Sequence, residues 1–254
     1  MSDDMRAALK ACAAVFPAAI ISGRGLEKVT SFVQLDELYY AGSHGLDITG
    51  PRSGQGNSGD PLLHQPVPWA CELMDSVHDH LLQGVGHIDG ASVEHNKFCV
   101  SVHYRQCPDR WPEVEAAVQT AVEQHERLHI TRGRKVYEVR PNVEWNKGKA
   151  LLFLLQELGL LPAEHAACRP EDSAASTVAQ GQVCSIYLGD DVSDEDAFKA
   201  LASTGLGIGI LVSSRVKDTA AKYTLRDPEE VQRFLEKLAD LGRRRQREAN
   251  GHLR

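Results

Sequence analysis

The sequence contains no apolar run that approaches the roughly 20 residues that a helix needs to cross a membrane. Its opening stretch, MSDDMRAALKACAAVF, also lacks the basic start and apolar core of a secretory signal, and has acids and an amphipathic pattern instead. These two absences predict a protein without a membrane partner.

Lysine and arginine are too scattered to form a basic face. The chain carries 28 of them against 35 acids, which makes the formal net charge −7. The run RRRQR at Arg243–Arg247 is the one basic cluster, and its place near the C-terminus is typical of a solvated helix end. Because affinity for nucleic acid depends on neutralising phosphates, we expect no nucleic-acid partner.

None of the six cysteines belongs to a C-x-x-C pair. Cys99 and Cys184 lie inside apolar runs that have the pattern of strands. Such usage is typical of reduced thiols in an intracellular protein and argues against a disulfide framework. We therefore expect a cytoplasmic protein.

The composition itself is that of a globular protein, with 42% hydrophobic and 25% charged residues over 254 positions. That length allows one large domain or two modest ones. A helical pattern over residues 2–15 precedes a short β-branched run that ends at Ser22-Gly23-Arg24-Gly25. A helix over 26–32 follows, and residues 38–48 are predicted as a strand that enters a glycine-containing loop. Strand, helix and strand at this spacing predict a parallel βαβ unit.

The pattern changes after a turn-rich, polar stretch over residues 50–61. The later run KFCVSVHYR alternates, with valines on one face and Ser101, His103 and Arg105 on the other. Two helices and two hairpins are predicted in this middle part, and together they make a compact inserted α+β unit. They cover residues 67–82, 92–105, 111–125 and 128–141.

The last part returns to an alternation of helices and strands, which predicts more of the parallel sheet. Residues 169–182 form a small-residue loop without a clear pattern. The predicted helices cover 146–160, 194–202 and 228–241, and the predicted strands cover 183–189, 207–212 and 223–226.

The stretch VCSIYLGDDVSDEDAF, from Val183 to Phe198, ends an apolar strand in a cluster of acids. Helix capping explains its second half, because Ser193 and Asp196 have the spacing of a capping box. Capping does not explain Asp190 at the strand tip. Since Mg²⁺ needs only one or two carboxylates beside water and phosphate, we expect Asp190 to bind it, with Asp194 ligating through water or holding the site in place.

Two further positions have the chemistry of a phosphate site. Ser22 and the N–H groups after it close a strand ahead of a helix, although an ordinary turn with a capping serine would look the same. Lys147 opens a helix, where the dipole disfavours positive charge by about 0.3–1 kcal/mol unless an anion lies beside it. Lys149 repeats this pattern, and an exposed lysine that tolerates the penalty is the alternative.

The order Ser22, Lys147 and Gly189-Asp190-Asp191-x-x-Asp194 resembles motifs two, three and four of the haloacid dehalogenase superfamily. The closer resemblance is to the plant-type trehalose-6-phosphate phosphatases. Six stretches carry it in family order over nearly the whole chain. They are FPAAIISGR, LYYAGSHGLDI, VEHNKFCVSVHYR, GRKVYEVRP, EWNKGKALLFLL and YLGDDVSDEDAF.

The resemblance implies an α/β fold, with a Rossmannoid core built on a parallel sheet and an inserted α+β cap. The core would comprise residues 1–60 and 140–254, and the cap residues 61–139. The implied reaction is Mg²⁺-dependent hydrolysis of trehalose 6-phosphate to trehalose and phosphate through an aspartyl-phosphate. Ser22 would bind the phosphoryl group, Lys147 would neutralise its charge, and Asp190 would ligate Mg²⁺ with support from Asp194.

In that family the cap binds and recognises the disaccharide and excludes water from the reaction. The alternative for each position in this cap is a solvated strand face. The implied substrate-binding residues are Arg24, His44, Glu94, Lys97, His103, Arg105, Glu138 and Arg140.

One family motif, D-x-D-G-T, has no counterpart in this sequence. Its first aspartate is the family's nucleophile, and Asp3-Asp4 do not replace it because they precede a helical pattern without an apolar strand. The resemblance thus predicts a core whose first strand is missing between residues 19–22 and 185–189. We expect a poorly stable, inactive chain or an incomplete reading of a longer gene.

Two other functions stay open at the level of sequence. One is a non-catalytic regulatory protein that binds a sugar phosphate through its cap. The other is a related sugar phosphatase with a different substrate.

Overall fold

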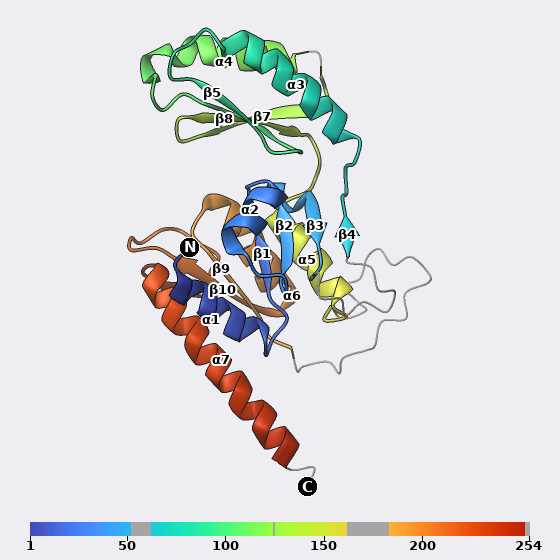
Figure 1. Cartoon of the computed structure of the whole chain (residues 1–254), viewed down its shortest axis with the longest axis vertical. Helices are drawn as coiled ribbons and strands as arrows, with labels where there is room; N and C mark the ends of the chain where they lie inside the picture. Colours follow the sequence, from blue (N-terminus) through green and yellow to red (C-terminus); the bar gives the residue numbers. More distant parts are fainter. Residues whose placement is uncertain (52–61, 124, 162–182, 252–254) are drawn as a thin grey trace.

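The computed structural model describes residues 1–51, 62–123, 125–161 and 183–251. The loop predicted over 169–182 and most of the stretch predicted over 50–61 lie outside these ranges. The described residues form a core of strands and helices with a smaller α+β cap above it (Figure 1). The α/β core and the inserted cap are therefore as predicted.

The first core sheet has the strand order β1-β2-β3-β4. Strands β1 (Ala19–Ile21) and β2 (Tyr39–Gly42) are parallel and are joined through helix α2 (Leu26–Val33), which confirms the predicted βαβ unit. The strand and the glycine-containing loop predicted over 38–48 are present, but the strand that returns after the loop was not predicted. The chain reverses in the short 3-10 turn η1 (Ser43–Gly45), because three consecutive residues there have positive φ, and returns antiparallel as β3 (Asp47–Thr49).

Strand β4 (Leu63–His64) is a short strand that the sequence pattern did not predict. It pairs antiparallel with β3, so these two residues belong to the core sheet by their hydrogen bonding. Two residues are too few to show any periodicity in a sequence, which explains why this strand was missed.

The second core sheet consists of the parallel strands β9 (Ser185–Gly189), β10 (Gly207–Val212) and β11 (Tyr223–Leu225). Its order is β11-β10-β9. Helix α6 (Glu195–Thr204) follows β9 and packs against both β10 and helix α5 (Lys147–Glu157). The parallel arrangement in this part of the chain is as predicted.

The two core sheets are separate, and their facing edge strands are β1 and β9. Ile21 on β1 packs against the apolar cluster that contains Tyr187 on β9, so these edges lie close together. The interruption of the sheet falls between β1 and β9, where the resemblance places a further strand. Edge strands with unpaired N–H and C=O groups are a liability for stability.

The cap is a four-stranded antiparallel sheet covered by two helices on the side away from the core (Figure 1). Its sheet order is β5-β6-β8-β7, and the buried faces of the helices and sheet share one apolar cluster. Both predicted hairpins and both predicted helices are present. The elements are α3 (Ala70–Val85), β5 (Ser92–His95), β6 (Val100–His103), η2 (Pro108–Arg110), α4 (Trp111–Val122), β7 (Leu128–Gly133) and β8 (Val136–Pro141).

Helices α1 (Asp3–Ala13) and α7 (Pro228–Gly251) pack against one another on the far side of the core from the cap (Figure 1). Helix α7 continues well past the predicted end at residue 241. Gly242 is the last position in close contact with the core, against Val15 and Phe16, and the residues from 243 to 250 are exposed. The apolar pattern thus predicted the packed part of the helix and not its full length.

No helix among the described residues is long and apolar enough to cross a membrane. Five cysteines fall in the described ranges and all are free thiols, as predicted. Burial raises the pKa of Cys99 to about 12, so this thiol is protonated at neutral pH.

Candidate active site

The centre of the candidate site is a buried group of three polar side chains. Lys147 donates from Nζ to Asp194 Oδ1 at 2.7 Å, and the hydroxyl of Tyr187 donates to the same oxygen at 2.8 Å. The Lys147 and Asp194 side chains are only 8% and 5% exposed. The anion that a lysine at a helix N-terminus needs is therefore a carboxylate of this chain.

The second oxygen of Asp194 is also occupied. Asp194 Oδ2 accepts from the backbone N–H groups of Asp190 and Asp191 at 3.0 Å each, so that both carboxylate oxygens are engaged. Burial alone would raise the pKa of Asp194, but the hydrogen bonds from Lys147, the backbone and Tyr187 outweigh burial and lower it. Asp194 therefore holds the end of β9 in place and leaves Asp190 free to face outward.

Gly189 makes this arrangement possible at the end of β9. A Cβ on Gly189 would lie 2.5 Å from Cβ of Asp194, which is closer than such atoms approach. The turn that follows is a capping box in which Asp191 accepts from the backbone N–H of Val192 at 2.7 Å. Capping thus uses Asp191 with Asp194, where the sequence had suggested Ser193 with Asp196.

A cavity of about 1200 Å³ opens beside this group, between the core and the cap. Ser22, Lys147 and Asp190, which come from three distant segments of the chain, all line it. Ser22 is placed by its turn, because its Oγ accepts from the backbone N–H of Arg24 at 3.1 Å. The exposed side chain of Asp190 lines the same space, so the three side chains share one cavity.

His44 stands on the wall of this cavity in a strained turn. Its φ is +58°, it follows Ser43 at +50°, and Gly23 must lack a side chain because a Cβ there would lie 2.7 Å from His44 Nε2. Burial, together with the positive charges of Arg140 and Lys147, lowers the pKa of His44 to about 3. The imidazole is therefore neutral at neutral pH.

The cap presents the polar face of its sheet to the cavity. Glu94 on β5, Ser101 and His103 on β6, and Glu138 on β8 line it, while the neighbouring valines pack into the cap's apolar cluster. The alternation predicted for residues 98–105 is therefore present in β6. It makes the roof of the cavity a surface of hydrogen-bonding side chains.

Four predicted residues do not line this cavity. Lys97 contacts the buried Asp47 of the core at 2.8 Å and faces a second cavity of about 830 Å³. Arg105 is exposed in the turn after β6, Arg140 lies on β8 and its positive charge helps to lower the pKa of His44, and Asp194 is buried behind Asp190. The others, Ser22, Arg24, His44, Glu94, His103, Glu138, Lys147 and Asp190, come together around it.

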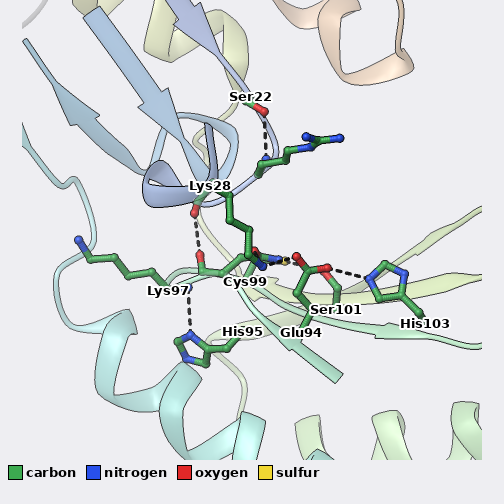
Figure 2. A network of polar contacts seen from close by, with 11 residues as sticks. Ser22, Lys28, Glu94, His95, Lys97, Cys99, Ser101 and His103 are labelled. Atoms are coloured by element: carbon green, nitrogen blue, oxygen red, sulfur yellow. Dashed lines mark hydrogen bonds and ion pairs between the residues drawn. The ribbon is translucent and has the colours of Figure 1, made fainter. Parts of the chain in front are cut away.

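Sequence reasoning missed several polar residues at this site, among them Tyr187, Lys28 and Asn96. Tyr187 looked like an apolar strand position, and only its contact with Asp194 reveals a polar role. Lys28 and Asn96 also line the cavity, and Lys28 joins Asn96 and Glu94 across the boundary between core and cap (Figure 2). A lysine on an amphipathic helix has no local signal that distinguishes it from a solvated one.

Comparisons with known sequences show the family to which the chain belongs. The chain matches the family model described as trehalose-phosphatase over residues 1–229. Probable trehalose-phosphate phosphatase 2 from Oryza sativa subsp. japonica is 47% identical over 94% of this chain and 62% of its own length. Trehalose-phosphate phosphatase B from Arabidopsis thaliana is 42% identical over 96% and 62% respectively. The chain thus spans less than two thirds of the length of these relatives.

Solved structures share the fold. A trehalose-6-phosphate phosphatase related protein matches with a TM-score of 0.70 at 18% identity, over 96% of this chain and 90% of its own. The C-terminal domain of a trehalose-6-phosphate phosphatase from C. albicans matches with a TM-score of 0.67 at 20% identity, over 94% and 84% respectively. Because the family model covers most of the sequence, the chain belongs to the trehalose-phosphatase family, with a haloacid dehalogenase-like core.

Proposed function

We propose that this chain supplies the phosphate site and the sugar-binding cap of a Mg²⁺-dependent phosphomonoesterase that acts on trehalose 6-phosphate. The supporting observation is the cavity that gathers Ser22, Lys147 and Asp190 opposite the polar face of the cap. A phosphorylated disaccharide has one anionic end and many hydroxyls, which matches a cavity with a cationic, carboxylate-edged floor and a hydrogen-bonding roof.

Each residue of the floor has a distinct task in this proposal. The Ser22 hydroxyl donates to a phosphoryl oxygen, and the buried ammonium of Lys147 offsets the negative charge of the phosphate. Asp194 and Tyr187 keep that ammonium in position through contacts of 2.7 and 2.8 Å with Asp194 Oδ1. His44 remains neutral, so the positive charge around the cavity comes from Lys147, Arg24 and Lys28.

Asp190 is the residue proposed to hold Mg²⁺. Among the described residues no group of three or more His, Cys, Asp or Glu side chains is placed to bind a metal by itself. A single exposed carboxylate still fits Mg²⁺, because this ion keeps several waters and takes further ligands from phosphate. When bound, the ion would neutralise phosphate charge beside Lys147.

We predict that Asp190→Asn lowers the affinity for Mg²⁺ in the presence of phosphate by about 10–100-fold or more, because a charged oxygen ligand is lost. Asp196→Asn, which removes a nearby carboxylate outside the cavity, is the matched control and should bind within about twofold of the unaltered chain. Isothermal titration calorimetry measures both. Equal affinities for the two variants would remove Asp190 from the proposed metal site.

The family's route uses an aspartyl-phosphate, and this sequence contains no D-x-D-G-T motif. We therefore predict that the 254-residue chain binds trehalose 6-phosphate but releases no phosphate from it. The same chain with a D-x-D-G-T strand supplied ahead of Met1 should release phosphate in the presence of Mg²⁺. A phosphate-release assay and calorimetry on both chains test this.

The outcomes separate the open alternatives. Binding of trehalose 6-phosphate without turnover in either chain would favour a sugar-phosphate sensor, and preference for another sugar phosphate in a substrate panel would favour a related phosphatase. The absence of any binding to either chain would overturn the proposed function.

A further inference from the structure

Lys28 connects the two halves of the cavity. It lies on α2, the core helix that follows the Ser22 turn, and its ammonium reaches two residues of the cap (Figure 2). It forms an ion pair with Glu94 Oε1 and donates to Asn96 Oδ1 at 3.0 Å. An ammonium has three donors, so one N–H remains for a ligand in the cavity that Lys28 lines.

Glu94 continues this connection into the roof of the cavity. Its second oxygen, Oε2, lies 2.9 Å from His103 Nε2 (Figure 2). The hydrogen bond from Lys28 is the largest cause that lowers the pKa of Glu94. Glu94 is therefore an ionised acceptor, held between a core lysine and a cap histidine, whose remaining lone pairs are available to hydroxyl groups.

Neighbouring contacts fix the position of the cap around Lys28. The buried Ser43 hydroxyl of the core donates to the backbone oxygen of Asn96 at 2.7 Å, and Lys97 contacts Asp47 at 2.8 Å. These contacts dock the turn after β5 on the core. Because these contacts hold the turn on the core, Lys28 meets Glu94 and Asn96 at a defined position.

The charge of Lys28 also decides which ligands Glu94 can accept. The cavity already contains the carboxylates of Asp190 and Glu138, so a further unpaired carboxylate would add acceptors without donors. The pair formed by Lys28 and Glu94 has no net charge, yet it offers both donors and acceptors. Such a pair suits neutral, hydroxyl-rich groups, while the phosphate end has its own cation in Lys147.

We propose that Lys28 is a specificity-determining residue, which holds Glu94 for the sugar and donates to a sugar hydroxyl of a phosphorylated disaccharide. This inference rests on the proposed function and adds a core residue to the sugar-binding part of the site. It predicts that Lys28 matters for the sugar and not for the phosphate.

The test compares Lys28→Met with the unaltered chain in calorimetry with Mg²⁺ present. The probes are trehalose 6-phosphate and inorganic phosphate. We expect the variant to bind trehalose 6-phosphate about 10–100-fold more weakly and inorganic phosphate within about twofold of the unaltered chain. Lys10→Met is the matched control, since Lys10 forms an exposed ion pair with Glu37 outside the cavity, and both affinities should be unchanged.

Two further variants separate positioning from a structural effect. Lys28→Arg, which keeps a cation and donors, should recover part of the lost affinity, and Glu94→Gln should make the effect of Lys28→Met smaller in the double variant. The Lys28 and Glu94 side chains are 48% and 39% exposed, so Lys28→Met should fold and melt close to the unaltered chain.

The outcomes are distinguishable from failure of the proposed function. If the unaltered chain binds neither probe, the proposed function is wrong, and if it binds trehalose 6-phosphate no more tightly than phosphate, the sugar-binding role of the cap is wrong. If the unaltered chain prefers trehalose 6-phosphate, equal losses for both probes in Lys28→Met, or no loss at all, would overturn the role of Lys28.

Discussion

Asp194→Ala is expected to lower the free energy of unfolding by about 3–5 kcal/mol, because it leaves one partner of a buried ion pair without the other. Lys147 is only 7% exposed and would lose the carboxylate that its Nζ contacts at 2.7 Å. The Tyr187 hydroxyl and two backbone N–H groups would lose their acceptor as well. A loss of this size is a large part of the stability of an ordinary domain.

Urea unfolding followed by circular dichroism measures this change. Asp240→Ala is the control, because Asp240 pairs with Arg243 at 2.6 Å on the exposed face of α7, where solvent screens the pair and its loss should leave the free energy of unfolding nearly unchanged. The double variant Asp194→Leu with Lys147→Met should be less destabilised than Asp194→Ala, since no buried charge remains. A cost for Asp194→Ala as small as that of the control would show that Lys147 reaches water when its partner is lost.

Acidification is expected to destabilise the chain through His44. Its pKa in the folded chain is lowered from 6.5 to about 3, so below pH 6.5 the unfolded chain binds a proton that the folded chain does not. Stability is highest above pH 6.5 and falls by about 1.4 kcal/mol per pH unit at most, until the pH reaches the folded pKa. Between pH 6.5 and 4.5 the expected loss from this group is about 2 kcal/mol.

His44→Asn isolates this contribution, because asparagine tolerates the positive φ of +58° at this position and does not titrate there. Burial also lowers the pKa values of His64 and His129, which remain in the variant and titrate with the same sign. The difference between the two chains in denaturant unfolding at several pH values therefore reports His44. Parallel stability curves from pH 6.5 to 4.5 would contradict a neutral, buried imidazole.

Local patterns predicted most elements but few of their connections. Alternation in residues 98–105 predicts a strand with one apolar and one polar face, and β6 has it, with its valines in the cap cluster and Ser101 and His103 lining the cavity. The return strand β3 was missed because its existence depends on three successive positive φ values at Ser43, His44 and Gly45. Only the glycine among them signals such a turn in a sequence.

In the candidate site, too, the sequence predicted individual residues but not the contacts between them. Lys147 was predictable because a lysine at a helix N-terminus requires a nearby anion. The sequence suggested a bound phosphate as that anion, and the structure places the carboxylate of Asp194 there. Asp190 and Asp194 looked alike as neighbouring acids. Gly189 leaves room for the Asp194 side chain, and the backbone N–H groups at the end of β9 bind it, so Asp194 is buried while Asp190 stays exposed. The periodicity of the sequence does not distinguish these two acids.

By itself the sequence determined the α/β core, the inserted α+β cap and the order of Ser22, Lys147 and Asp190, because these follow from local periodicity and from motifs along the chain. Only the tertiary structure decided that Lys28 meets Glu94 and that Lys97 contacts Asp47 beside a second cavity. It also decided that His44 lines the site as a neutral imidazole. These pairs are distant in sequence, and their energies depend on burial and on opposing charges that exist only once core and cap are docked.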